Sequence, residues 1–231
     1  MTEDKKKEIN EKDEKIRHSC ISCGIYNCEK RTGNFPPFCL AGEENNEIIE
    51  KSLEIYKGDD TAAKFALAAA QVEGEFYCKA PRVEEIIIFA KKIGAKKIGI
   101  ASCSGLIEES KIFAKILRAK GLEPFGAICK VGGVDKNEVG IPDETKIRKG
   151  GYEPMCNPIA QALFLNEEKT DLNVIMGLCV GHDSLFIKYS DAMVTTLVTK
   201  DRVLAHNPVG ALYTSGSYYK RLVAEEKNQE L

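Results

Sequence analysis

Apolar and polar positions in the first half of the chain recur at the spacing of helices. Glu47 to Tyr56 carries apolar residues three and four positions apart, which predicts an amphipathic helix. A longer helix is predicted from Asp59 to Val72, with the aspartates at its start as caps. Pro81 suits the first turn of a third helix, Arg82 to Ile93, and Gly94 ends it.

From Lys97 onward, short apolar runs alternate with amphipathic stretches. The runs predict strands at 97–102, 122–130, 173–180 and 192–199. The stretches between and after them predict helices at 105–119 and 158–165, another from Ser184 and a last one at 208–227, in which Gly216 could be a break. A Gly-rich polar stretch, 132–151, is expected to form a long excursion. Strands that alternate with helices indicate an α/β fold, a Rossmann-like open parallel sheet of about four strands flanked by helices.

Composition divides the chain into four predicted parts. These are a charged extension (1–17), a Cys-rich segment (18–42), a helical region (43–94) and an α/β domain (95–231). The extension has no apolar core, so it is expected to be neither a secretory signal nor a membrane anchor. The net charge of −2 gives no reason to expect nucleic acid or membrane partners. We therefore expect a cytoplasmic protein.

Nine cysteines in a chain without a predicted export signal point to metal binding or catalysis, because cytosolic thiols stay reduced. One group is close in sequence and consists of Cys20, Cys23, Cys28 and Cys39. Its first two members form a CxxC turn, and the segment has few large hydrophobic residues with which to fold alone. A four-thiolate metal site is predicted here, with zinc or an iron–sulfur cluster as its occupant.

A second group of cysteines follows the ends of the predicted strands. Cys103, Cys129 and Cys179 lie where three predicted strands end, and Cys156 comes just before the helix that Asn157 opens. The carboxyl ends of parallel strands gather at one edge of a sheet, where ligands bind, so these four thiols are expected to converge. Helix N-termini at that edge favour thiolates, which suit metal or nucleophile chemistry. Cys78 lies between the two groups, and the sequence does not decide its role.

Polar residues beside the second group are candidates for catalysis. His182 and Asp183 follow Cys179 and could act as a proton-donor pair, or Asp183 could simply cap a helix. His206 precedes another turn and could reach the same edge. Cationic residues that could hold an anionic ligand, or simply be solvated, also lie at or just past strand ends; they are Lys130, Lys200 and Arg202, with Asp201 beside them.

Several motifs resemble one uncharacterised family. They are the N-terminal CxxCGxxxC, EGEFYCK (73–79), KKIGIASC (96–103), CNPIAQA (156–162), GLCVGHD (177–183) and KDRVLAHNP (200–208). From about Cys20 to Tyr213 the chain is similar to metal-binding proteins of archaea and anaerobic bacteria, the domain of unknown function 1847. The resemblance implies metal binding but no particular reaction.

Three functions fit these observations. The first is an iron–sulfur protein with a 4Fe-4S cluster on the second group, serving redox or sulfur chemistry on a small molecule. The second is an electron carrier for a redox partner protein. The third is a zinc protein with a structural site at Cys20 and a second zinc or thiol site. Dinucleotide and P-loop motifs are absent, so nucleotide binding is not indicated.

Overall fold

The computed structural model describes residues 18–30, 33–42 and 45–224; the charged extension predicted at 1–17 lies outside them. The chain divides into two compact units, residues 1–67 and 68–231, and the division falls within α4. The four parts predicted from composition stay a prediction. None of the helices within the described residues is long and apolar enough to cross a membrane.

The first unit contains short helices and no sheet among its described residues. Its elements are η1 (Cys20–Ser22), α2 (Asn27–Lys30), α3 (Asn46–Gly58) and the start of α4 (Asp60–Phe76). The predicted cap of α4 is confirmed, because Asp59 Oδ1 accepts hydrogen bonds from the amides of Thr61 and Ala62, at 2.8 and 3.0 Å. None of the described residues of the Cys-rich segment is buried, so hydrophobic packing does little to hold it.

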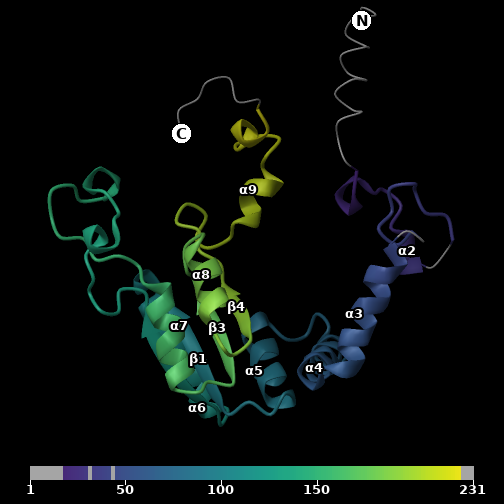
Figure 1. Cartoon of the computed structure of the whole chain (residues 1–231), viewed down its shortest axis with the longest axis horizontal. Helices are drawn as coiled ribbons and strands as arrows, with labels where there is room; N and C mark the ends of the chain where they lie inside the picture. The colour runs from purple at the N-terminus through teal and green to yellow at the C-terminus, as the bar shows by residue number, and fades with distance from the viewer. Residues whose placement is uncertain (1–17, 31–32, 43–44, 225–231) are drawn as a thin grey trace, which may run out of the picture. The chain divides into compact units, whose positions relative to one another are not determined.

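The second unit is built on a four-stranded parallel sheet of strand order β2-β1-β3-β4. The strands are β1 (Lys97–Ser102), β2 (Glu123–Ile128), β3 (Leu172–Met176) and β4 (Val194–Val198), as Figure 1 shows. The helices are α5 (Arg82–Lys92), α6 (Ile107–Ala119), α7 (Pro158–Glu167), α8 (His182–Tyr189) and α9 (Val209–Tyr213). Short 3-10 helices complete it: η3 (Ser104–Leu106), η4 (Lys136–Val139), η5 (Asp143–Thr145) and η6 (Lys220–Val223). The α/β prediction is confirmed.

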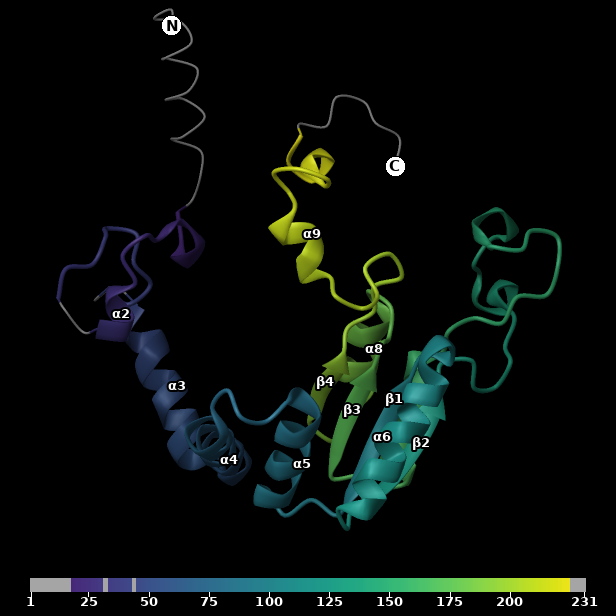
Figure 2. The ribbon, with the colours of Figure 1, turned by 180° about the vertical axis from the view of Figure 1, so that it is seen from behind.

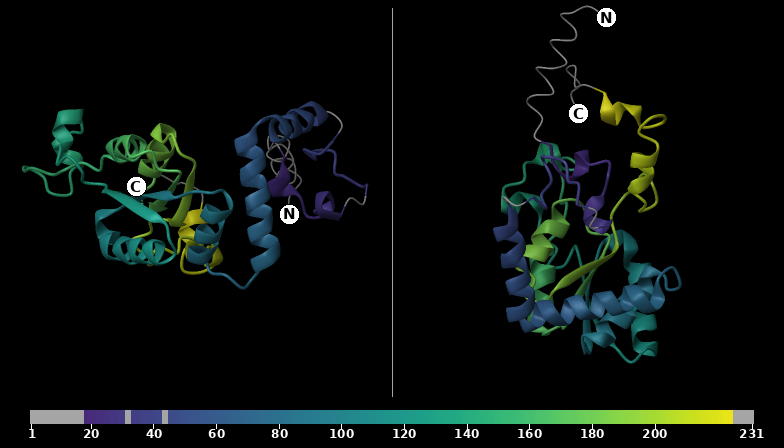
Figure 3. Two further views of the ribbon diagram at one scale, coloured as in Figure 1. Left: turned by 90° about the horizontal axis from the view of Figure 1, so that it is seen from below. Right: turned by 90° about the vertical axis from the view of Figure 1, so that its right-hand side faces the viewer.

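The helices cover both faces of the sheet. α7 and α8 lie on the face seen in Figure 1, and α5 and α6 lie on the face seen in Figure 2; the left panel of Figure 3 shows the same layers from below. Every residue of β3 is buried, as a central parallel strand requires. The core continues to the carboxyl ends of the strands, where Ala101, Ile175 and Phe186 pack in one cluster with Cys103 and Cys129.

Some predicted boundaries are wrong. The third strand ends at Met176 rather than Val180, because Gly177 turns the chain with φ of 72°. The tail is not one helix through Lys227; within the described residues it forms only the short helices α9 and η6.

Candidate functional site

The carboxyl edge of the sheet contains a topological switch point between β1 and β3. The chain leaves β1 through α6 on one face to reach β2, and it returns through α7 on the other face to reach β3. The loops after β1 and β3 therefore diverge, and α/β proteins commonly bind ligands at such a point. Cys103 follows β1 directly and Cys179 follows β3 by three residues, so both lie in the loops that border this switch point.

Strand pairing brings Cys103 and Cys129 side by side. The amide of Cys129 donates to Ser102 O (2.8 Å), and the amide of Cys103 donates to Met176 O (3.0 Å). Both thiols are buried. The amide of Ser104, where η3 begins, donates to the Cys129 Sγ at 3.3 Å. Amide hydrogen bonds of this kind stabilise negative charge on sulfur and tune sulfur-ligated centres.

Cys156 reaches the same place through the turn that opens α7. The amide of Asn157 donates to Cys129 O (2.7 Å), and its side-chain oxygen accepts from the amide of Ala160 (3.0 Å), which confirms Asn157 as the helix cap. Cys156 packs against the cluster that contains Cys103 and Cys129. Three of the four predicted thiols thus belong to one packed cluster of side chains.

Cys179 lies at the turn into α8, beside a cation. Its carbonyl accepts the amides of His182 and Asp183, at 2.9 and 3.1 Å, which closes the first turn of the helix. Arg202 Nη2 donates to the Cys179 Sγ at 2.9 Å. The turn before Cys179 needs Gly177, because a Cβ there would lie 2.2 Å from Leu106 Cδ1.

Thiols and cations polarise one another at this edge. A hydrogen bond from the Cys129 thiol lowers the pKa of Cys156 to about 6, with Lys130 adding to the effect, while a nearby Cys179 thiolate opposes it. The same hydrogen bond, with burial, raises the pKa of Cys129 well above its ordinary value. Cys156 is therefore the thiolate of the pair and Cys129 the thiol.

Gln161 on α7 is a buried residue that sequence reasoning missed. Its Nε2 donates to Ala127 O at 2.6 Å and to Ser102 O at 3.1 Å, which are the strand ends just before Cys129 and Cys103. Gln161 is fully buried, and its Oε1 has no hydrogen-bond partner among the described residues. Its place within CNPIAQA, four residues after Asn157, was the one available signal.

The polar residues predicted as catalytic candidates lie in two different elements, the start of α8 and the loop after β4. α8 begins at His182, so Asp183 lies in its first turn, and the interpretation of Asp183 as a cap before Ser184 is wrong; Gly181 holds that position. Burial and the charge of Lys130 lower the pKa of His182, which favours the neutral imidazole. His206 accepts the amide of Asp201 at Nδ1 (3.2 Å), so this nitrogen holds a loop and only Nε2 is left for chemistry.

The predicted excursion between Cys129 and Cys156 is an ordered loop that extends beyond the strand ends (Figure 1). Lys146, with 4% of its surface exposed, pairs with Asp135 (2.9 Å) and Asp143 (3.3 Å). Lys136 pairs with Glu153, and the amide of Met155 donates to Val134 O at 2.8 Å. These contacts tie together the two ends of the loop that carries the Cys129–Cys156 pair.

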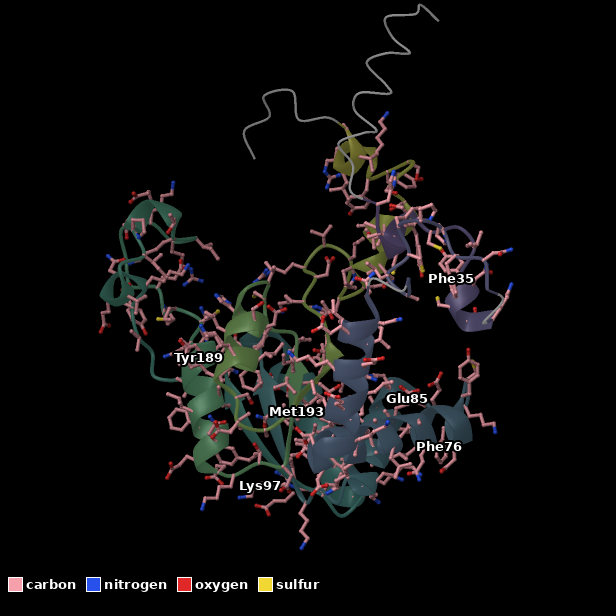
Figure 4. The ribbon with its side chains drawn as sticks, turned by 45° about the vertical axis from the view of Figure 1, so that its right-hand side comes forward. Phe35, Phe76, Glu85, Lys97, Tyr189 and Met193 are labelled. Atoms are coloured by element: carbon pink, nitrogen blue, oxygen red, sulfur yellow. The ribbon has the colours of Figure 1, made fainter. Side chains whose placement is uncertain are left out.

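The N-terminal cysteines lie in tight turns of the first unit. The amide of Cys23 donates to Cys20 O at 3.1 Å, and backbone hydrogen bonds from Ile25 and Tyr26 lower the pKa of Cys23. The ring of His18 lies 5.4 Å from that of Phe38, which brings the start of the segment to the residue beside Cys39. Phe35, between Cys28 and Cys39, is labelled in Figure 4.

All nine cysteines are free thiols, and Cys78 is exposed at the end of α4 with φ of 55°. Among residues 18–30, 33–42 and 45–224, no three Cys, His, Asp or Glu side chains are grouped closely enough to hold a metal ion as they stand.

Among the described residues, the opposite end of the sheet carries ion pairs and no predicted site residue. There Lys97, labelled in Figure 4, pairs with Glu168 (3.1 Å) and Glu123 (3.7 Å).

Comparison with known proteins identifies the family. Residues 39–197 match the family described as Protein of unknown function (DUF1847). The chain belongs to this family. It is also 49% identical over 190 residues to an uncharacterized protein of Methanocaldococcus jannaschii, a match that covers 82% of this chain and 95% of the relative. No solved structure matches. The matched range contains all four cysteines of the sheet edge but begins only at Cys39 of the N-terminal group.

Proposed function

We propose that this protein uses the four thiols at the carboxyl edge of its sheet, Cys103, Cys129, Cys156 and Cys179, to hold an iron–sulfur cluster for redox or sulfur chemistry on a small molecule. One observation carries the proposal: four thiols from three loops, with Cys129 and Cys156 at the two ends of one of them, lie at the same edge of the sheet beside a switch point. A structural role would not require a cysteine after β1, after β2, before α7 and after β3. Free cysteines that serve only as small apolar residues have no reason to follow strand ends.

The side chains fit a thiolate-ligated group in kind. Soft thiolates select iron–sulfur clusters and zinc, and four of them satisfy one cluster. The amide of Ser104 and the guanidinium of Arg202 already donate to two of the sulfurs. Lys130 and Arg202 compensate the negative charge that ligated thiolates carry. Loading requires the thiols to rotate toward one another, since they are not grouped for a metal as they stand.

Each residue then has a definite part. The cluster supplies a one-electron couple at the strand ends. Ser104 N–H and Arg202 stabilise the thiolates of Cys129 and Cys179, and the apolar floor around Phe186 excludes water from beneath them. His182, neutral at its half-buried position, offers an N–H to a bound molecule. The N-terminal cysteines hold a separate metal, zinc or a second cluster, that orders their segment.

Metal analysis of the full chain prepared without oxygen tests the proposal. The expected protein is brown, with a broad visible absorption that is lost on reduction. Cys179→Ser is expected to remove the metal of the sheet edge and leave that of the N-terminal group, while Cys78→Ser changes neither. Colourless protein with stoichiometric zinc, or unchanged metal content in Cys179→Ser, would contradict the cluster.

The hydrogen-bonded pair Cys129 and Cys156 favours a second candidate, a thiol catalyst. Here the Cys156 thiolate attacks one sulfur of a small disulfide substrate and releases the first thiolate. Cys129, deprotonated in the same step, then displaces the second thiolate and forms a Cys129–Cys156 disulfide. Two electrons and the proton of Cys129 pass to the substrate. Mass spectrometry of metal-free protein treated with glutathione disulfide tests it: a mixed disulfide that stays at Cys156 would contradict the pair.

A further inference from the structure

Three cations surround the sheet-edge thiols without acidic partners. Lys130, Lys200 and Arg202 form no ion pair with a carboxylate among residues 18–30, 33–42 and 45–224. The nearest acid in sequence is Asp201, and its Oδ1 is occupied by the amides of Val203 and Leu204, at 2.9 and 2.7 Å. Elsewhere in this unit, cations such as Lys97, Lys136 and Lys146 have carboxylate partners. No carboxylate ion pair within the described residues therefore compensates the charge of these three cations at the thiol edge.

A gap lies between one of these cations and one of the thiols. A Cβ built on Gly105 would lie 3.6 Å from Lys200 Nζ and 3.9 Å from Cys103 Sγ. The ammonium and the thiol thus lie near the same point, and glycine leaves that point free of a side chain. Gly105 is exposed at the N-terminal end of η3 and α6, where backbone amides add partial positive charge.

The loop after β4 holds the other cation at the same edge. Lys200 and Arg202 lie two residues apart, and the loop is closed by the amide of His206 donating to Asp201 O (2.9 Å). Arg202 uses one N–H on Cys179 Sγ, and its remaining donors can bind an oxyanion in the planar fork that carboxylates and phosphates match. His206, which accepts the amide of Asp201 at Nδ1, is a positioning residue for both cations.

We infer that Lys200, Arg202 and the backbone at Gly105 form a binding site for the oxyanion group of a small anionic molecule, placed against Cys103 and Cys179. The inference rests on the proposed function in that the anion is the substrate of the thiol edge. It names the class of that substrate as a small carboxylate, phosphate or sulfur oxyanion.

The alternative is that the cations only balance the charge of ligated thiolates. A charge-balancing role requires no free space between Lys200 and Cys103 and no exposed donors. Arg202 is exposed, and the position of the absent Cβ at Gly105 is within ordinary contact distance of both groups. These two features distinguish a site that admits a molecule from one that only neutralises charge.

Calorimetry on the full chain prepared without oxygen tests the inference, with sulfate, inorganic phosphate and propionate as probes and neutral propionamide as control. At least one anion is expected to bind with a stoichiometry of one, and propionamide is expected not to bind. Lys200→Met and Arg202→Met are each expected to weaken binding at least tenfold. Lys120→Met, which removes a cation after the C-terminus of α6, is the matched control and leaves binding unchanged.

A glycine pair tests the gap itself. Gly105→Ala has no strained φ and no clash, so the chain is expected to fold normally while the methyl group weakens anion binding severalfold. Gly126→Ala in β2, where a Cβ would likewise meet neighbours only at 3.6 and 3.7 Å, is expected to bind as the unchanged chain does.

Metal content separates the two proposals. Anion binding that is lost in Lys200→Met while metal content is retained supports the inference. Absence of binding by every probe, or loss of metal without any anion binding, overturns it in favour of charge balance. Anion binding by a protein that never holds metal would instead overturn the cluster and leave the oxyanion site in place.

Discussion

The two cysteine groups differ in how the chain around them is held in position. The N-terminal thiols lie within twenty residues of one another, in a segment with no buried side chain among its described residues. The thiols of the sheet edge come from loops up to 76 residues apart, yet they lie on a packed core that includes Ile175 and Phe186. Hydrophobic packing therefore does little to order the first group, whereas the packed core sets the positions of the second.

The largest expected difference between the two cysteine groups is their response to removal of metal. If the Cys-rich segment is held by a metal, a chelator removes on the order of 10–16 kcal/mol of apparent binding energy from it. We expect rapid proteolysis within residues 18–42 after chelation, with the sheet unit intact, measured by mass spectrometry of the fragments. Cys20→Ser should reproduce the effect and Cys78→Ser should not. Equal resistance to proteolysis with and without chelator would contradict the idea that a metal orders the N-terminal segment.

A substitution of Gln161 tests whether the fold holds the strand ends that carry the second cysteine group. Gln161→Met keeps the length of the side chain but leaves the carbonyls of Ala127 and Ser102 without this donor. We expect a loss of about 1–3 kcal/mol in the free energy of unfolding, measured by urea denaturation. Gln71→Met on the exposed face of α4 is the control, and a similar loss there would remove the argument from Gln161.

Thiol reactivity measures the difference in ionisation between Cys156 and Cys129 within the second group. Because a pKa of about 6 keeps Cys156 ionised above that pH, metal-free protein should be alkylated there with a midpoint near pH 6. At pH 7 Cys156 should carry roughly thirty times the thiolate fraction of an ordinary thiol of pKa about 8.5, so it should be alkylated faster. Peptide mapping after iodoacetamide treatment measures this. Lys130→Met should move the midpoint upward, and a reactive Cys129 would contradict the assignment of the thiolate.

The smallest effect concerns the loop between Cys129 and Cys156. Lys146 lowers the pKa of Asp135, and Lys136 lowers that of Glu153. A carboxyl group whose pKa is lower in the folded loop than in the unfolded chain stabilises the folded loop at pH values above the unfolded pKa, about 4. This stabilisation is lost as the pH falls through the lower pKa of the folded loop. Amide exchange over residues 135–153, corrected for intrinsic rates, should accelerate below about pH 4. Residues 107–119 of α6 serve as the control and should keep their protection.

Much of the sheet could be predicted because its signal is local. β1 occupies residues 97–102 as the apolar run predicted, and Asn157 and Asp59 act as the caps that their positions indicated. Errors lie where tertiary contacts decide. The third strand ends early because Gly177, beside Leu106, turns the chain with a positive φ, and Asp183 falls inside α8 because Gly181 holds the cap position of that helix.

The sequence by itself determined that eight of the nine thiols form two groups. It also determined that three of them follow strand ends and that Cys156 precedes a helix, because periodicity and capping are local properties of the chain. Only the tertiary structure decided how the thiols act together. The pairing of Cys129 with Cys156, the contact of Arg202 with Cys179 and the bridge of Gln161 join residues 23 to 59 positions apart. Such contacts depend on strand order and on which face each helix covers, which no local pattern encodes. Eight of the nine thiols thus fall into two different groups, one set by spacing and one by topology.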